Sequence, residues 1–168
     1  MTYIIETERL RLRKFTLEDH VFIIELLNSP GWLEFIGDRN VHTPEQARRY
    51  LENGPLKSYL VHGYGLSMVE TKDDGVPIGM CGILNRDTLE NPDIGFAFLP
   101  AYHGQGYALE ITQAMVDHAR HALGLSRIAA ITVPGNRRSI RLLEKLGLQY
   151  VRSFSFPGSK EVLLLYAN

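Results

Sequence analysis

A glycine-rich stretch at residues 102–108 constrains the fold of this chain more than any other feature. It reads Tyr-His-Gly-Gln-Gly-Tyr-Ala, with glycines at Gly104 and Gly106, and it joins a short apolar run at residues 94–99 to a long helical pattern. A strand that passes through such a turn into a helix presents backbone N–H groups at the helix start, where the helix dipole also attracts anions. The stretch therefore predicts a strand–turn–helix unit whose turn binds a ligand that carries phosphate groups.

Two common phosphate-binding motifs do not fit this turn. No Lys-Ser or Lys-Thr pair follows it, so it is not a Walker loop. A Rossmann turn stands near the start of its fold and is followed by a strand that ends in an acidic residue. Here the turn lies past the middle of the chain, and the next predicted strand, residues 127–133, ends in Pro-Gly-Asn. Two glycines alone also fit a tight connection without any ligand, and that alternative stays open at this point.

The second half of the chain predicts a parallel crossover followed by a hairpin. Apolar residues at spacings of three and four predict one buried helix stripe, made of Ala108, Ile111, Met115, Ala119 and Ala122. Gly124 ends this helix, and residues 127–133 form the next strand. Strand, helix and strand in this order make a right-handed parallel unit. Asn136 caps a further helix, and strands at residues 150–156 and 162–166 close the chain.

The first half of the chain predicts an antiparallel arrangement. Residues 9–15 alternate between apolar and charged side chains, which predicts a strand with one wet face that carries Arg11 and Arg13. Thr16 and Thr43 each precede a helical pattern and predict helix N-caps. The predicted elements are a strand at 9–15, helices at 17–28, 32–36 and 44–59, and strands at 66–70, 76–84 and 93–99.

Together these elements predict an α+β (mixed α/β) fold with helices on both faces of one sheet. The sheet is antiparallel at first and parallel around the crossover, with about six to seven strands. A chain of 168 residues suits a single domain, so we expect residues 1–168 to form one.

Balanced charge and a single cysteine limit the classes of function. With 18 basic and 19 acidic residues, the chain has no general attraction for nucleic acid or anionic membranes, and neither is an expected partner. Cys81 lies in the apolar run at residues 78–84 and predicts a core thiol; one cysteine excludes a disulfide framework, and we expect no metal. Residues 1–20 lack a signal peptide pattern, and the apolar run at residues 21–27 carries Glu25 and is too short to span a bilayer, so we expect a soluble cytoplasmic protein.

The flanks of the glycine turn add a resemblance to a known family. Residues 95–110 resemble the acetyl-coenzyme A binding segment of the GNAT superfamily of N-acetyltransferases. The usual core of that segment is Arg or Gln, two residues, Gly, one residue, then Gly or Ala. This chain supplies Gly106 and Ala108 but has His103 at the basic or amide position.

Further segments resemble the same superfamily in the expected order. Residues 136–147 resemble its Asn-x-x-Ser segment that runs to Glu-Lys-Leu-Gly. Residues 8–19 and 78–87 resemble the Rim-type branch, which acetylates the N-termini of ribosomal proteins. The resemblance covers nearly the whole chain and implies a GNAT-like fold with a splayed parallel strand pair. It also implies acetyl-coenzyme A as the co-substrate.

The resemblance assigns binding roles to two sets of residues. The pyrophosphate of coenzyme A is expected on the N–H groups of His103, Gly104, Gln105, Gly106, Tyr107 and Ala108. The pantetheine arm is expected along main-chain groups of Phe96, Ala97, Phe98 and Leu99, where one N–H faces the developing oxyanion. Asn136 resembles a residue that hydrogen-bonds the pantetheine or nearby backbone, with helix capping as the alternative. His103 adds a positive charge or a hydrogen bond, or is a solvent-facing turn residue.

The catalytic residues are less defined than the binding residues. Ser139 is the candidate donor of a proton to the departing thiolate, because some relatives place a tyrosine where this chain has Leu143; a helix-surface hydroxyl is the alternative. Asp93 begins the strand before the turn and is the candidate general base. The acceptor-side region holds Glu34, Asp38 and His42, which are further candidates or solvated surface groups. Glu110 is interpreted as support for the helix after the turn.

The sequence thus predicts an acetyl-coenzyme A-dependent N-acetyltransferase. The acceptor is a primary amine on a protein N-terminus or on a small molecule, and attack is direct in a ternary complex. The alternative is a coenzyme A-binding module without catalysis, because the tyrosine is missing and no motif marks the base. The chain is expected to be a monomer or a homodimer.

Overall fold

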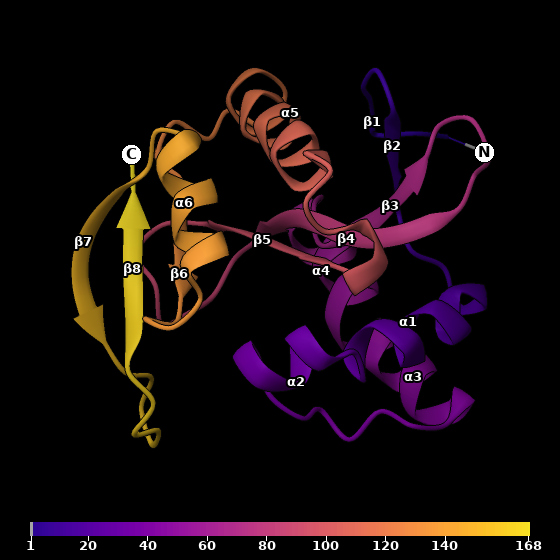
Figure 1. Ribbon diagram of the computed structural model, residues 1–168, viewed down its shortest axis with the longest axis horizontal. Helices are drawn as coiled ribbons and strands as arrows, with labels where there is room; N and C mark the ends of the chain where they lie inside the picture. The colour runs from indigo at the N-terminus through magenta and orange to yellow at the C-terminus, as the bar shows by residue number, and fades with distance from the viewer. Residues whose placement is uncertain (1) are drawn as a thin grey trace.

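Eight strands form one mixed sheet in the order β1–β2–β3–β4–β5–β6–β8–β7 (Figure 1). The computed structural model describes residues 2–168. The strands are β1 (Ile5–Glu6), β2 (Leu10–Arg13), β3 (Ser67–Thr71), β4 (Pro77–Leu84), β5 (Asp93–Phe98), β6 (Ala129–Thr132), β7 (Gln149–Phe154) and β8 (Leu163–Ala167). Among these described residues, only β5 and β6 pair in parallel; the other neighbours are antiparallel. The predicted mixed α/β fold is confirmed, with one strand more than expected, because the two-residue β1 is too short to show a pattern.

Helices cover both faces of this sheet (Figure 1). The α-helices are α1 (His20–Leu27), α2 (Pro30–Phe35), α3 (Pro44–Leu51), α4 (Lys57–His62), α5 (Tyr107–His121) and α6 (Arg137–Lys145). In the view of Figure 1, α5 lies above β4 and β5, α6 lies beside β8, and α1, α2 and α3 lie below the central strands. Each layer has its own core: Ile111 and Met115 of α5 belong to one, and Leu26 of α1 and Leu51 of α3 to the other. The predicted stripe of α5 is buried in its centre, whereas its last member, Ala122, is exposed at the helix end.

The helix N-caps predicted at Thr16 and Thr43 are both present. Thr16 and Asp19 form a capping box at the 3₁₀ turn Leu17–Asp19 that leads into α1. Thr43 and Gln46 form a second box at α3, where Gln46 N–H donates to Thr43 Oγ1 (3.2 Å). The predicted helix at residues 44–59 continues to the end of α4 through a π-helical segment, Glu52–Leu56, which contains a proline that has no N–H to donate.

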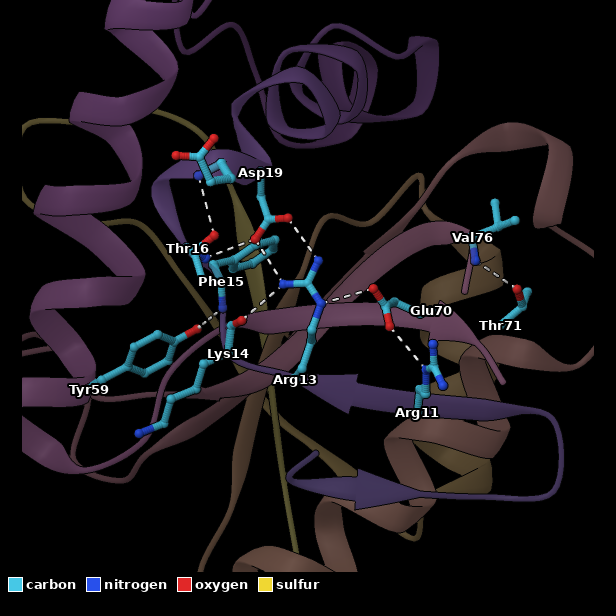
Figure 2. A network of polar contacts seen from close by, with 11 residues as sticks. Arg11, Arg13, Lys14, Phe15, Thr16, Asp19, Tyr59, Glu70, Thr71 and Val76 are labelled. Carbon is cyan, nitrogen blue, oxygen red and sulfur yellow. Dashed lines mark hydrogen bonds and ion pairs between the residues drawn. The ribbon is translucent and has the colours of Figure 1, made fainter. Parts of the chain in front are cut away.

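A buried ion-pair network joins the first strands to α1 (Figure 2). Arg13 is only 7 % exposed, so the predicted wet face of β2 is wrong at this position. Its guanidinium donates to both oxygens of Asp19 (2.8 and 2.9 Å) and to Glu70 Oε2 (2.9 Å). Arg11 binds the other Glu70 oxygen at 3.1 Å. The alternation of residues 9–15 did not reveal these partners, because Glu70 comes from β3, opposite Arg11 in the sheet.

The same region anchors α4 to the sheet (Figure 2). Tyr59 Oη accepts a hydrogen bond from the Phe15 N–H at 3.0 Å and donates to the Leu66 carbonyl at 2.5 Å. Burial raises the pKa of Tyr59, so its hydroxyl stays protonated and can donate. These contacts hold the helical layer made by residues 44–62 over the start of β3.

Candidate functional site

The parallel strands β5 and β6 pair at a single register position, Asp93 with Ala129. The Ala129 N–H donates to the Pro92 carbonyl at 2.8 Å at this junction. Beyond it, the described residues show no further pairing between the two strands, and β5 runs toward the start of α5 (Figure 1). One side of β5 therefore presents main-chain groups that no strand covers.

The register of β4 and β5 identifies those groups. Leu99 N–H donates to the Ile78 carbonyl at 2.9 Å, so Leu99 faces β4. Main-chain groups of successive strand residues point to opposite sides, which also turns Ala97 toward β4. Phe96 and Phe98 face β6. Of the four residues predicted to bind a ligand through their main chain, only these two present N–H and C=O groups on the uncovered side.

The glycine turn leads from β5 into α5 with two residues in left-handed backbone conformation. Gly104 has φ 75° and Gly106 has φ 80°, a region that strongly favours glycine. Gly106 is the N-cap of α5, and no side chain caps this helix. The first N–H groups of a 15-residue helix are thus left for another partner. A Cβ built on Gly104 meets no atom within 4 Å, so the space beside the turn is open.

Arg9, which the sequence did not single out, lies behind the turn. Its Nη1 donates to the Gln105 carbonyl at 2.9 Å, and its guanidinium stacks on the Tyr107 ring at 4.3 Å. Its Nε donates to Glu110 Oε1 at 2.7 Å, and Thr7 Oγ1 donates to Oε2 of the same carboxylate at 2.6 Å. Because Arg9 holds a carbonyl of the turn, it directs that peptide's oxygen toward the N-terminal strands.

The charge state of Glu110 follows from these contacts. Burial acts to raise the pKa of the Glu110 carboxyl, but hydrogen bonds from Thr7 and Arg9 outweigh it and lower that pKa. The carboxylate therefore stays ionised and keeps Arg9 in place. Arg9 and Glu110 are 101 residues apart in sequence, and no motif links them, so the role of Arg9 could not be predicted from the sequence.

His103 bridges β5 and α6. Its Nε2 lies 3.0 Å from the Phe98 carbonyl, and its Nδ1 contacts Nη1 of Arg138. A carbonyl only accepts and an arginine only donates, so this arrangement requires a neutral ring with its proton on Nε2. His103 was predicted to add a positive charge or a hydrogen bond, and in this arrangement it makes hydrogen bonds. The positive charge beside the turn belongs to Arg138, another residue that the sequence did not single out.

Asn136 and Ser139 lie at the start of α6. Asn136 Oδ1 accepts a hydrogen bond from the Ser139 N–H at 3.2 Å, so the capping alternative for Asn136 is present. Its side-chain NH₂ remains for a second contact. The Ser139 hydroxyl makes no hydrogen bond to another residue between positions 2 and 168, and the side chain is half-buried.

Asp93 is buried, with 1 % of its surface exposed. Both of its carboxylate oxygens lie near Arg86 Nε, at 3.2 and 3.3 Å. Burial raises the pKa of Asp93 above its usual value, although Arg86 acts to lower it. The carboxylate thus faces an arginine, and a proton can reach it only through water or after Arg86 moves.

A cavity of about 830 Å³ lies between residues 39–62, which include α3 and α4, and the end of β4. Leu66 and Leu84 are among its lining residues. A Cβ built on Gly95 would lie 2.8 Å from Leu84 Cδ1 and 3.4 Å from Leu66 Cδ2, so these two side chains pack beside β5. They lie between the cavity and the strand, of which no residue itself lines the cavity. Glu34, Asp38 and His42, the other candidates for a base, are not among its lining residues.

The single cysteine is part of the core. Cys81 is buried in β4, and burial raises the pKa of its thiol, in agreement with a core cysteine. Among residues 2–168, no three His, Cys, Asp or Glu side chains are grouped to hold a metal ion. No helix in this part of the chain has the length and apolar character needed to cross a membrane.

Comparison with known proteins identifies relatives along most of the chain. A family model described as "Acetyltransferase (GNAT) domain" matches residues 9–149. The uncharacterized N-acetyltransferase YoaA of Bacillus subtilis is 30% identical over 148 residues, which cover 87% of this chain and 82% of YoaA. The crystal structure of a GNAT-family acetyltransferase from Bacillus anthracis has a TM-score of 0.80 at 26% identity, covering 98% of this chain and 96% of its own.

A structure of RimL, a ribosomal α-N-protein acetyltransferase in complex with coenzyme A, also has this fold. Its TM-score is 0.81 at 16% identity, with 99% of this chain and 97% of that chain covered. At such low identity the likeness concerns the fold alone. The predicted resemblance to the Rim-type branch is therefore not confirmed.

Proposed function

Because this chain belongs to the GNAT acetyltransferase family, we propose that it transfers an acetyl group from acetyl-coenzyme A to a primary amine. The amine belongs to a protein N-terminus, as in the Rim-type branch, or to a small molecule. RimL, which shares the fold, is complexed with coenzyme A, and this supports the same donor here. Attack is direct in a ternary complex, since the single cysteine, Cys81, is 0 % exposed and unsuited to carry the acetyl group.

The observation that carries this proposal is the uncapped start of α5 at Gly106. A helix N-terminus without a side-chain cap has N–H groups and a dipole that suit a pyrophosphate. The open space beside Gly104 leaves room for phosphate oxygens, and Arg138 adds a positive charge on the α6 side. These features favour a phosphate seat over a merely tight connection. The seat comprises His103, Gly104, Gln105, Gly106, Tyr107 and Ala108.

Of the four residues predicted to bind the pantetheine arm through their main chain, we retain two. Phe96 and Phe98 present main-chain groups on the uncovered side of β5, and the Phe98 carbonyl already accepts from His103. The Phe98 N–H and both groups of Phe96 remain for the ligand. The NH₂ of Asn136 is a further donor from the facing helix. An N–H aimed at the developing oxyanion contributes about 3 kcal/mol to the transition state.

The chemistry requires two proton movements. When bound, acetyl-coenzyme A supplies the thioester carbonyl carbon at which a C–N bond forms while the C–S bond breaks. A neutral amine must lose one proton, and the departing sulfur gains one. We assign the first proton to Asp93, which accepts it through water. The hydroxyl of Ser139, which has no other partner in the part of the chain that the structure describes, donates the second proton to the sulfur. The Ser139 oxygen then takes a proton from water as Asp93 releases its own to solvent, so that both groups return to their starting states.

Two substitutions test these assignments. Asp93→Asn is expected to lower kcat by about 10²-fold or more and to remove the acidic limb of the kcat–pH profile. A lowered kcat with an unchanged profile would instead make Asp93 a residue that positions Arg86. Ser139→Ala is expected to lower kcat while the KM of acetyl-coenzyme A stays constant, because the hydroxyl acts after binding.

A thiol-release assay with acetyl-coenzyme A and a panel of amines tests the function as a whole. Peptides with free N-termini, amino acids and polyamines serve as acceptors, and mass spectrometry identifies the acetylated amine. Release of coenzyme A that depends on an acceptor supports the proposal. Tight binding of coenzyme A without release on any acceptor would identify a binding module without catalysis.

A further inference from the structure

The cavity has more basic than acidic side chains in its lining. The basic ones are Arg39, Arg49 and Lys57, and the one acid is Asp87. The chain as a whole is nearly balanced, with 18 basic and 19 acidic residues, so the lining departs from that balance toward positive charge. A concave surface lined by one sign of charge attracts ligands of the opposite sign.

Among residues 2–168, none of these three basic side chains lies within 4.0 Å of a carboxylate, whereas Arg9, Arg11, Arg13 and Arg86 are ion-paired. The three side chains of the cavity are therefore not neutralised by an ion pair within the described chain and can interact with a ligand.

The cavity lies at the end of β5 where the reaction is expected. Phosphates seated on the glycine turn place the thioester farther back along β5, toward its junction with β6. Two lining residues of the cavity, Leu66 and Leu84, pack beside Gly95, which is near that junction. A second cavity, of about 700 Å³, borders the turn end of β5 at Leu99 and Tyr102 and is lined by acids without any lysine or arginine. Its position beside the phosphate end makes it the less suitable acceptor site.

The cavity also offers a neutral hydrogen-bond donor. The Tyr50 side chain lines it, and its hydroxyl has no hydrogen-bond partner among the described residues. Burial raises the pKa of Tyr50, while the charges of Arg39 and Arg86 act to lower it. A hydroxyl donor and Arg39 in one cavity lining suit a carboxylate or phosphate group.

We propose that this cavity selects acceptors whose amine is accompanied by an anionic group, a carboxylate or a phosphate. This inference rests on the proposed acetyl transfer and adds the class of acceptor. A volume of about 830 Å³ holds a ligand the size of a short peptide or a modified amino acid. Polyamines and other polycations are excluded, because they would face Arg39, Arg49 and Lys57.

A matched set of peptides tests the proposal. The acceptors are Ala-Asp-Asp-Ala, Ala-Asn-Asn-Ala and Ala-Lys-Lys-Ala, each with an amidated C-terminus, so that only the central pair differs in charge. Alanine and alaninamide form a second arm, which distinguishes a free amino-acid carboxylate from an acidic peptide as the source of the anion. We expect kcat/KM to be at least about fivefold higher for the acidic than for the neutral peptide, and lowest for the basic one.

Arg49→Gln is the informative variant, and Arg48→Gln is its control. Both residues are exposed in the last turn of α3, but only Arg49 lines the cavity. Arg49→Gln should reduce kcat/KM for the acidic peptide by about threefold to fivefold relative to that for the neutral peptide. Arg48→Gln should change neither. Raising the ionic strength should weaken the preference for the acidic peptide.

Binding separates this proposal from the transfer reaction. Anisotropy of a peptide labelled at its C-terminal end reports binding to the cavity without any chemistry. Equal binding and equal kcat/KM for all three peptides, or the same effect of both arginine variants, would overturn the anionic acceptor while acetyl transfer stands. Charge-selective binding without thiol release on any acceptor would support the cavity assignment and contradict the transfer reaction.

Discussion

Glu110→Gln offers a direct test of how the N-terminal strands support the glycine turn. The Glu110 carboxylate accepts from Thr7 Oγ1 (2.6 Å), the Arg9 N–H (2.9 Å) and Arg9 Nε (2.7 Å). A glutamine can keep its oxygen toward the first two donors, but its NH₂ then faces Arg9 Nε, and one charge-assisted bond is lost. Such bonds contribute about 1.5–3 kcal/mol, and the Arg9 side chain is 42% exposed, so we expect the variant to lose about 1 kcal/mol of unfolding free energy.

The same substitution should weaken coenzyme A binding. Without its ion pair, Arg9 no longer holds the Gln105 carbonyl, and the turn loses its fixed orientation. A loss of about 1 kcal/mol in the free energy of coenzyme A binding, equal to the loss in unfolding free energy, corresponds to about a fivefold rise in Kd. Urea denaturation and isothermal titration with coenzyme A measure the two effects. The control is Glu8→Gln, which removes the same charge at an exposed side chain that makes no hydrogen bond within the described chain.

The pH dependence of this effect has a defined sign. The pKa of Glu110 is lower in the folded protein than its usual value of 4.5, so the carboxylate stabilises the fold above that pH. The stabilisation disappears as pH falls through the lowered pKa. The difference between the wild type and Glu110→Gln should therefore be constant near neutral pH and shrink below about pH 4.5. A stability difference between the wild type and Glu110→Gln that persists in acid would refute the role of the Glu110 carboxylate. An equal loss of stability in Glu8→Gln would refute it as well.

Three further predictions concern other parts of the fold. Arg13→Met removes the ion-pair partner of Asp19 and one of the two arginine partners of the buried Glu70, and should lower the unfolding free energy by about 3 kcal/mol in urea denaturation, whereas Lys14→Met at the next, exposed position should have little effect. Gly106→Val should raise the KM of acetyl-coenzyme A far more than that of the amine, while Gly158→Val, which strains the same φ of 80° in an open loop, should lower stability alone; an unchanged cofactor KM in the first variant would contradict the phosphate seat. Cys81→Ala should keep its acetyltransferase activity, and a Cys81 acetyl adduct that turns over would contradict direct attack.

Local signals explain what the sequence could predict. The capping boxes at Thr16 and Thr43 lie within four residues, and short-range hydrogen bonds decide them whatever the rest of the fold does. Gly104 and Gly106 likewise predict a turn, because few other residues adopt a positive φ at low cost. Such features are visible in one segment of the chain at a time.

Long-range pairing explains what the sequence could not predict. Arg13 looked like a solvent-facing strand residue until β3 placed Glu70 beside it, 57 residues away in the chain. The pairing of His103 with Arg138 depends on how α6 packs beside β5, which no residue pattern encodes. The charge of the cavity has the same origin, because its cations come from the loop before α3, from α3 and from α4.

In the proposed site, strand geometry at β5 keeps donor and acceptor recognition apart. The main-chain groups of Phe96 and Phe98 face the uncovered side in the plane of the sheet, while two lining residues of the cavity, Leu66 and Leu84, pack beside Gly95. All the proposed donor contacts lie after residue 93, and the three cavity cations lie before residue 58. Substitutions in α3 and α4 can therefore change the acceptor without moving the donor seat. We expect exchanges of charge at Arg49 to alter the KM of the amine and to leave the Kd of coenzyme A unchanged; a parallel change in both constants would show that the two halves of the site are coupled.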